Sequence, residues 1–327
     1  MESQVSFAVS EWSRKKKQTK REKFLGQMEE MVPWGRLVEL IAPHYPKGER
    51  GRPPKGIERM LRVYFLQQWY GLADEALEDA IYDSQAMRLF VGVDLSREGV
   101  PDATTLLKFR HLLERHDLTR GILEEINAVL SEQKCLMKEG TIVDATIIAA
   151  PSSTKNESRQ RDGEMHQTRK GNQWYFGMKA HIAMDAQSGL VAKVIGTAAN
   201  ISDISQTHAL LHGQEKDVFA DAGYLGVEKR PEIASRSHQP RWHIAAKRGV
   251  IRAMPEGRLK ALTLELEKLK AQVRSRVEHP FHIIKNLFRH RKTRYRGLAK
   301  NTAQLHTLFA LANLILARRT FTQSVYP

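Results

Sequence analysis

Residues 140–151, "GTIVDATIIAAP", are the segment that most clearly predicts the fold class of this chain. They are β-branched and apolar on both faces, as expected for a central strand that is covered on both sides of its sheet. One carboxylate, Asp144, interrupts the apolar run. A buried carboxylate is costly unless it meets a cation or another partner. The stretch therefore predicts an α/β domain with an acidic site inside its sheet.

The residues after this strand continue the same kind of domain. Residues 174–200 predict two strands around the turn "DAQSG", and "DVFADAGYLG" (217–226) predicts another buried strand. Residues 257–288 and 301–319 have helical patterns, the second with Asn301 and Gln304 in cap positions. The polar residues 152–173 predict an exposed, mobile loop. We expect a domain over residues 138–320 and a short tail over 321–327.

The residues before the strand predict a different, mostly helical domain over 24–137. Helical patterns cover residues 56–72, 73–92 and 101–116. A pair of these helices fits either a DNA-reading helix-turn-helix or ordinary packing partners, and the sequence leaves both open. Residues 1–23 form a basic arm, because "SRKKKQTKREK" (13–23) has seven basic residues and one acid. Such an arm is a solvated segment that can lie on DNA.

Composition limits the class of protein. The 327 residues are enough for two domains, and the net charge of +15 with a pI near 9.9 favours a polyanionic partner, of which nucleic acid is the usual one. The longest apolar stretch, residues 308–317, is too short for a bilayer, and the N-terminus lacks a signal-like apolar core. A single cysteine, Cys135, excludes an intrachain disulfide and a Cys-based zinc site. These features predict a reducing cytoplasm and no membrane partner.

Two further carboxylates join Asp144 as candidates. Asp221 ends a predicted strand, where it fits either a turn-forming Asp or a site residue. Glu278 is the only acid among nine Lys or Arg in residues 271–300. Three carboxylates about 4 Å apart would repel by roughly 4 kcal/mol per pair at an effective dielectric constant of 20. Divalent ions would relieve this repulsion, and hard oxygen ligands favour Mg²⁺ or Mn²⁺ over zinc.

The helix that carries Glu278 also carries cations at helical spacing. Arg274, Glu278 and Lys285 are separated by four and seven residues, so they share one face of a continuous helix. A structural salt bridge with Arg274 would explain the glutamate alone. It would not explain Lys285 or the basic run from Arg289 onward, which fits phosphate binding. Pro280 should bend the helix directly after Glu278.

Several motifs together resemble a known family. Arg274–x3–Glu278–x6–Lys285 resembles part of the signature of bacterial insertion-sequence DDE transposases. "VDATIIAAPSSTKN", "KGNQWYFGMKAHIAMDAQSGL", "TAANISD" and "ADAGYLG" resemble the insertion-sequence-five family within the insertion-sequence-four superfamily. The N-terminal "GRPP", "QQWYGLADEALEDAIYDSQAMRLF" and "PDATTLLKFRHLLE" are also similar to that family. The resemblance covers nearly the whole chain, and five ordered motifs are a more specific signal than one.

The resemblance implies an RNase H-like catalytic core behind the helical domain. Asp144, Asp221 and Glu278 fall on the family's catalytic, metal-binding acids, with Mg²⁺ or Mn²⁺ as cofactor. Arg274 and Lys285 fall on its basic positions, and the basic run implies Arg289 as a further DNA contact. Asn200 and Asp203, in "TAANISD", are candidates for supporting the site. The superfamily signature has Tyr where this chain has Ala271, so any contact of that Tyr is absent here.

The implied function is DNA transposition. The protein would bind the terminal inverted repeats of an insertion sequence, cleave the ends and join the 3′-OH to target DNA by two-metal phosphoryl transfer. Its partner would be double-stranded DNA, with a homo-oligomer in the DNA complex, in the bacterial cytoplasm and associated with the nucleoid. The 57 residues from Asp221 to Glu278 imply a reduced insertion between these acids.

Two other kinds of protein fit parts of the pattern. One is a decayed transposase that acts as a non-catalytic DNA-binding repressor, against which the intact acid triad argues. The other is a different metal nuclease on the same fold. A strand-transfer assay separates the second from a transposase, because a simple nuclease cleaves but never joins.

Overall fold

The computed structural model describes the backbone of residues 15–48, 53–133, 140–157 and 159–325, and side chains up to residue 318. The chain divides into two compact units, Met1–Leu118 and Thr119–Pro327. The division lies before the 137 expected from the sequence, because α8 (Leu118–Glu132) packs within the second unit. There the Asn127 side-chain amide donates to Val191 O at 3.0 Å and accepts from Asn313 Nδ2 at 2.8 Å. Cys135 lies outside the described residues.

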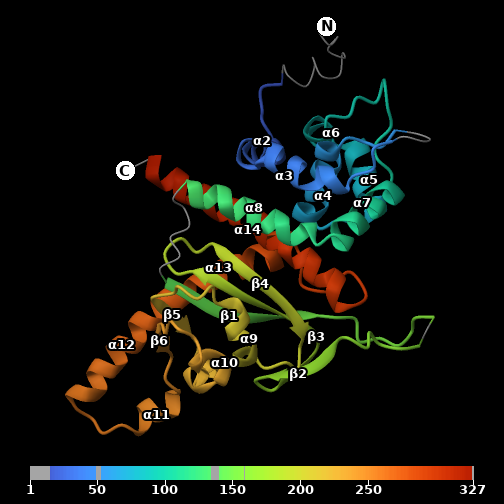
Figure 1. Ribbon diagram of the computed structural model, residues 1–327. Coiled ribbons are helices and arrows are strands. Elements are labelled where there is room, and N and C mark those ends of the chain that lie inside the picture. Colours follow the sequence, from blue (N-terminus) through green and yellow to red (C-terminus); the bar gives the residue numbers. More distant parts are fainter. Residues whose placement is uncertain (1–14, 49–52, 134–139, 158, 326–327) are drawn as a thin grey trace. The chain divides into compact units, whose positions relative to one another are not determined.

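The first unit is helical, as the sequence predicts (Figure 1). Its helices are α2 (Lys20–Met31), α3 (Trp34–Ile41), the 3₁₀ helix η1 (Ala42–His44), α4 (Ile57–Tyr70), α5 (Asp74–Asp83), α6 (Gln85–Val91) and α7 (Ala103–Arg115). The centre of its core is α4, which buries nine residues between Met60 and Trp69. Burial on most sides of α4 agrees with the buried helix that "GIERMLRVYFLQQWYGL" predicts, although Arg62 within this run is only half-buried.

Three capping residues set the helix boundaries of this unit. The Ser84 hydroxyl accepts from Met87 N at 3.4 Å and begins α6, so the single helix expected over 73–92 is two. Asp102 caps α7, as predicted, by accepting from Thr105 N at 2.6 Å. Thr19 and Glu22 form a capping box at α2. The last four residues of the predicted arm, 20–23, are therefore helical.

The second unit is built on a mixed sheet. Its strands are β1 (Gly140–Ala149), β2 (His166–Lys170), β3 (Gln173–Asp185), β4 (Val191–Ala198), β5 (Asp217–Ala220) and β6 (Arg241–Ile244). The order is β2-β3-β1-β5-β6, and β4 also pairs with β3. β1 runs antiparallel to β3 and parallel to β5, so it is a central strand, as predicted. The predicted strand pair over 174–200 is also confirmed, and so is a strand from residue 217; this strand ends at Ala220 and not at Gly223 as expected, because the 3₁₀ helix Ala222–Tyr224 follows it.

The stretch predicted as a loop, 152–173, is wrong in its second half. Residues 166–170 form β2, which pairs antiparallel with the start of β3. The tight turn between them includes Gly171, whose φ of 61° suits glycine. β2 reads "HQTRK" and is almost wholly exposed, so it has no apolar alternation by which a strand is recognised.

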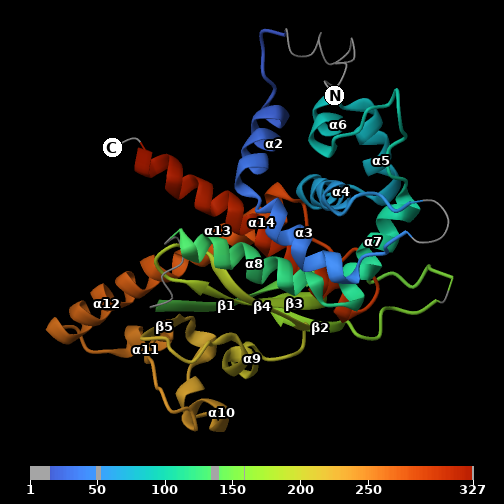
Figure 2. The same cartoon turned by 45° about the horizontal axis from the view of Figure 1, so that its top comes forward.

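Helices cover both faces of the sheet. Figures 1 and 2 show α9 (Asp203–Leu210) and α10 (Pro231–Ala234) on one face, with α8, α13 (Glu278–His282) and α14 (Leu298–Val325) on the other. Val143 belongs to the core cluster under α9 and α10. Because successive strand residues point to opposite faces, Asp144 points to the face that carries α13.

The chain between β6 and α14 contains helices of three types. It forms α11 (Arg248–Ala253), α12 (Arg258–Arg274), the 3₁₀ helix η4 (Ser275–Val277), α13 and the π-helix η5 (Ile283–Leu287). α14 begins before the predicted cap: Asn301 lies inside it, and its Oδ1 accepts from the backbone N–H of Arg294 and Tyr295 at 3.3 Å. Among the described residues, no helix combines the length and apolar character needed to cross a membrane.

Candidate active site

The three predicted carboxylates line one cleft of about 640 Å³ in the second unit. Asp144 comes from the middle of β1, Asp221 follows the end of β5, and Glu278 begins α13. The sheet thus brings together residues that are 77 and 57 positions apart in sequence. The other residues that line the cleft are Ala145, Thr146, Ile147, Ala149, Lys170, Tyr175, Arg274, Phe281, His282, Lys285, Asn286 and Arg291.

Asp144 lies in a buried and charged environment. Its Oδ1 accepts from Ala145 N at 2.7 Å. Burial, and to a smaller extent the negative charges of Asp221 and Glu278, raise the pKa of Asp144 from 3.8 to about 6, against the opposing effects of the bond from Ala145 N and of Arg274. The three acids are therefore electrostatically coupled.

The Asp221 carboxylate both forms a turn hydrogen bond and lines the cleft. It caps the 3₁₀ helix η2 (Ala222–Tyr224), and its Oδ1 accepts from Gly223 N at 2.8 Å. This is the turn bond expected of a strand-end aspartate. The same carboxylate lines the cleft, so the turn fixes its position beside Asp144. The two interpretations of Asp221 that the sequence left open are compatible.

Glu278 lies where the helix changes its winding. A 3₁₀ turn, η4, precedes it, and the π-helix η5 follows α13. Pro280 has no N–H to give to the turn before it. The backbone nevertheless stays helical from α12 to η5, and the changes of winding bring Arg274, Glu278 and Lys285 into one cleft. π-helical turns are frequent at functional sites.

Basic side chains form one wall of the cleft. The Lys285 ammonium donates to Thr146 Oγ1 at 2.6 Å and to Ile147 O at 2.9 Å, which holds it against β1. Burial lowers the pKa of Lys285, and the neighbouring charges of Lys170 and Arg291 lower it further. Sequence reasoning missed Lys170 as a cleft residue because β2 was expected to be a loop. Arg291 was only one member of the basic run.

The two other predicted DNA-binding residues differ in position. Arg274 lines the cleft and stabilises the charge of Asp144, but no ion pair within 4 Å joins it to Glu278 in the part of the chain that the structure describes. Its buried Nε has no hydrogen-bond partner there. A purely structural Arg274–Glu278 salt bridge is therefore absent. Arg289 is exposed, has a φ of 59°, and does not line the cleft.

Comparison with known proteins identifies the family. The family described as "Transposase DDE domain" matches residues 136–314, and the "Transposase domain (DUF772)" matches residues 12–112. The chain belongs to the DDE transposase family. A piggyBac transposase synaptic complex with hairpin DNA is similar in structure, with 9% identity and a TM-score of 0.45 over 91% of this chain and 73% of that chain.

Family membership confirms several predictions. The DDE transposase has a helical N-terminal region followed by an RNase H-like domain of mixed sheet and helices. It is an enzyme of the class that cuts and transfers DNA strands. The insertion-sequence-five family, the roles of individual site residues and the details of end binding remain predictions.

The cleft of the transposase supplies donors suited to a hard cation. In the described ranges, no three His, Cys, Asp or Glu side chains lie close enough to form a complete metal site on their own. The donors at the cleft are nevertheless carboxylates, and the pKa of Asp144 is raised mainly by burial and also by the charges of Asp221 and Glu278, which a divalent ion would neutralise. The chemistry of the residues therefore fits a hard divalent cation, and the family typically uses a divalent metal.

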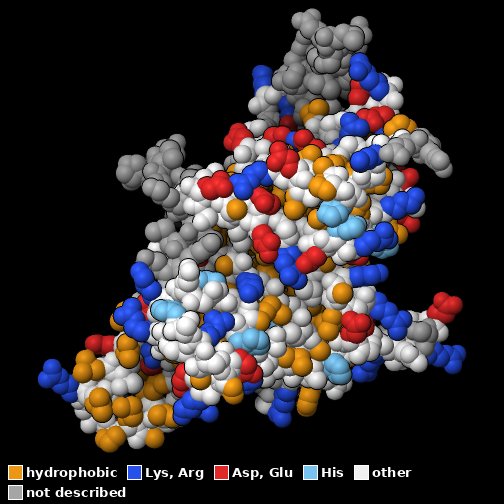
Figure 3. Space-filling view, viewed as in Figure 1, with side chains coloured by type: hydrophobic (Ala, Val, Ile, Leu, Met, Phe, Trp, Pro, Cys, Tyr) orange, Lys and Arg blue, Asp and Glu red, His pale blue; other side chains and the backbone are white. Residues whose placement is uncertain are grey.

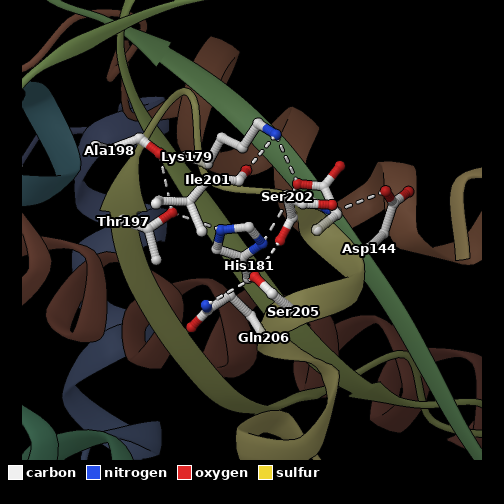
Figure 4. Close-up of polar contacts among 11 residues, drawn as sticks. Asp144, Lys179, His181, Thr197, Ala198, Ile201, Ser202, Ser205 and Gln206 are labelled. Atoms are coloured by element: carbon white, nitrogen blue, oxygen red, sulfur yellow. Dashed lines mark hydrogen bonds and ion pairs between the residues drawn. The ribbon is translucent and has the colours of Figure 1, made fainter. Parts of the chain in front are cut away.

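A buried polar cluster lies under α9 (Figure 4). His181, on β3, is fully buried, and its Nε2 is 2.7 Å from Thr197 Oγ1. Its Nδ1 faces Asp203 Oδ1 at 3.6 Å, and Asp203 pairs with Lys179 at 2.9 Å. Burial lowers the pKa of His181 to about 4, so the ring is neutral at physiological pH. Lys179 also donates to Ile201 O, which ties β3 to the start of α9.

Tyr224 links this cluster electrostatically to the acids. It is the buried last residue of η2, and its hydroxyl has no hydrogen-bond partner in the described structure. Burial raises the pKa of Tyr224 well above 10, and Asp144, Asp203 and Asp221 raise it further. Of the two predicted supporting residues, Asp203 thus lies near the acids, whereas Asn200 is exposed in a turn.

Proposed function

We propose that this DDE transposase belongs to the insertion-sequence-five family and moves its own element. It binds the terminal inverted repeats, cleaves the element ends and joins the 3′-OH to target DNA. The observation that carries the proposal is the single cleft in which Asp144, Asp221 and Glu278 meet a wall of cations. Acids alone would repel DNA, and cations alone would only bind it.

Asp144, Asp221 and Glu278 would hold Mg²⁺ or Mn²⁺. When bound, the ions supply charge neutralisation and activation of the attacking oxygen in phosphoryl transfer. The protein contributes a rigid placement of the acids. Asp144 is held by the backbone of β1 and Asp221 by its turn bond to Gly223.

The cations of the cleft position the DNA backbone. Lys285 uses two of its three ammonium protons for Thr146 and Ile147, and the third is free to contact a phosphate oxygen. Arg274 has a planar guanidinium suited to phosphate and no competing ion pair with Glu278. Lys170 and Arg291 extend the positive wall. The scissile phosphate is thereby held against the acids.

The partner is double-stranded DNA, both at the element ends and at the target. Two ends must be held together for transposition, so we propose a homo-oligomer in the DNA complex. The net charge of +15 supports attraction to DNA from a distance. We place the protein in the bacterial cytoplasm, in association with the nucleoid.

The test replaces each acid without changing its size. Asp144→Asn, Asp221→Asn and Glu278→Gln should each abolish Mg²⁺-dependent cleavage and strand transfer while end binding stays at the wild-type level. Glu256→Gln is the matched control, because that side chain is 88% exposed and pairs only with Lys260 on the helix surface. Substantial nicking by any one triad variant would remove that residue from the site. Cleavage without joining by the wild type would indicate a simple nuclease.

A further inference from the structure

Helix α12 exposes a row of leucines. Leu259, Leu262, Leu266 and Leu269 are 71%, 53%, 51% and 59% exposed, and no residue of α12 is buried. In Figure 3 hydrophobic side chains gather at the lower left, where Figure 1 places α11 and α12. Single exposed leucines are ordinary, whereas a contiguous row marks a surface that another protein surface covers.

Polar contacts fix which side of α12 faces outward. Glu267 accepts from Ala246 N at 2.9 Å, and Lys270 donates to Ile244 O at 2.9 Å. Ile244 ends β6 and Ala246 lies just after it, so Glu267 and Lys270 lie on the inner side of the helix. The helix is therefore attached to its own unit through a polar stripe. The leucines are left to the solvent by this arrangement.

The spacing of the leucines indicates that the partner surface is another helix. They follow one another at intervals of three, four and three residues, which is the a/d repeat of a coiled coil. We propose that this leucine row, Leu259, Leu262, Leu266 and Leu269, packs against the same row of a second copy of the chain. The two α12 helices run parallel and form a short two-stranded coiled coil.

The charges beside the row favour the parallel arrangement. With leucines at a and d, Glu265 occupies a g position and Lys270 the following e position. A parallel pair sets Glu265 of each copy next to Lys270 of the other, an attractive g–e′ contact. An antiparallel pair with all leucines matched brings the two Glu265 side chains together. Lys270 donates two of its three ammonium protons to Glu267 and Ile244 within its own chain, which leaves the third for Glu265 of the other copy.

The proposed α12 interface is connected to the acidic cleft by the continuous helical segment between them. α12 ends at Arg274 and continues through η4 into Glu278. A second copy docked on α12 therefore fixes the helix that carries Arg274 and leads into Glu278. The pairing itself depends only on the leucine row, so its failure and a failure of the proposed DNA chemistry give different results.

The first test is the mass of the full-length protein in solution. Light scattering and sedimentation from about 1 to about 100 µM should show a reversible dimer. Leu266→Glu should weaken it at least about a hundredfold, because both copies lose a leucine from the seam. Leu264→Glu is the control, since Leu264 is 50% exposed but lies off the seam, and should dimerise like the wild type. A monomer at all concentrations, or equal effects of the two variants, would overturn the proposal.

The second test determines the direction of the pair. In a Cys135→Ser background, Leu262→Cys should form a disulfide between two copies on mild oxidation, whereas Leu264→Cys should not. In an antiparallel pair residue 262 would instead lie opposite residue 266. A disulfide that forms only when Leu262→Cys and Leu266→Cys proteins are mixed would therefore overturn the parallel arrangement. Unchanged circular dichroism of each variant confirms that these exposed substitutions leave the fold intact.

Discussion

Replacing Asp144 by Asn should make the metal-free protein more stable at neutral pH. Burial and the charges of Asp221 and Glu278 raise the pKa of Asp144 from 3.8 to about 6, so its ionisation is disfavoured in the fold. A shift of roughly 2 units corresponds to at most about 3 kcal/mol at 1.36 kcal/mol per unit. The amide keeps the shape and can still accept from Ala145 N. The variant should therefore gain up to this free energy of unfolding.

The effect has a defined dependence on pH. A carboxyl whose pKa is raised by folding contributes stability below pH 3.8, and this contribution is lost as the pH rises through about 6. The difference between variant and wild type should thus be small at pH 4 and complete above pH 7. For a unit of this size, each kcal/mol moves the melting temperature by about 2–4 °C, so we expect a rise of up to about 6–12 °C.

Calorimetry at several pH values, with EDTA or with Mg²⁺, measures these changes. Mg²⁺ should raise the melting temperature of the wild type and have little effect on Asp144→Asn. Asp217→Asn is the control of opposite sign: bonds from His243 and Arg241 hold the pKa of Asp217 below its usual range despite burial. Its loss should destabilise the protein at neutral pH. A metal-free Asp144→Asn that melts below the wild type at pH 7.5 would refute the reasoning.

Two further predictions concern DNA. Lys285→Ala and Arg274→Ala should each reduce cleavage by at least about tenfold while repeat binding stays near the wild-type level, because both side chains line the cleft; normal cleavage by both variants would show that this basic face is ordinary solvated surface. A fragment of residues 1–118 should bind terminal-repeat DNA with an affinity that falls steeply with salt, as measured by fluorescence anisotropy. Equal affinity for random DNA at moderate salt would place end recognition elsewhere in the chain.

The sequence predicts the central strand of the catalytic unit well, because few structures bury a segment on both faces. The run around Asp144 is apolar on both faces, and only a central strand accommodates that pattern. Asp221 and Glu278 stand out because each is an acid in an unusual setting, one at a strand end and one in a basic helix. Their meeting in one cleft follows from the sheet order, which spacing alone does not specify.

The features that sequence reasoning missed depend on contacts rather than on pattern. β2 is polar on both sides and is held only by its pairing with β3, so Lys170 could not be assigned to the cleft. β6, "RWHI", is too short to recognise and is defined by its pairing with β5. Ser84 is an ordinary polar residue until its hydroxyl caps α6. The outward orientation of the α12 leucines likewise follows from two hydrogen bonds, not from periodicity.

The changes of winding around Glu278 have a mechanical consequence. In η4, α13 and η5 the backbone bonds reach successively three, four and five residues back along the chain. Moving the boundary between η4 and α13 by one residue exchanges one hydrogen bond for another and turns the side chains beyond it by about 20°, the difference between 120° per residue in a 3₁₀ helix and 100° in an α-helix. The direction of the Glu278 side chain is therefore set in small increments by the type of helix on either side of it.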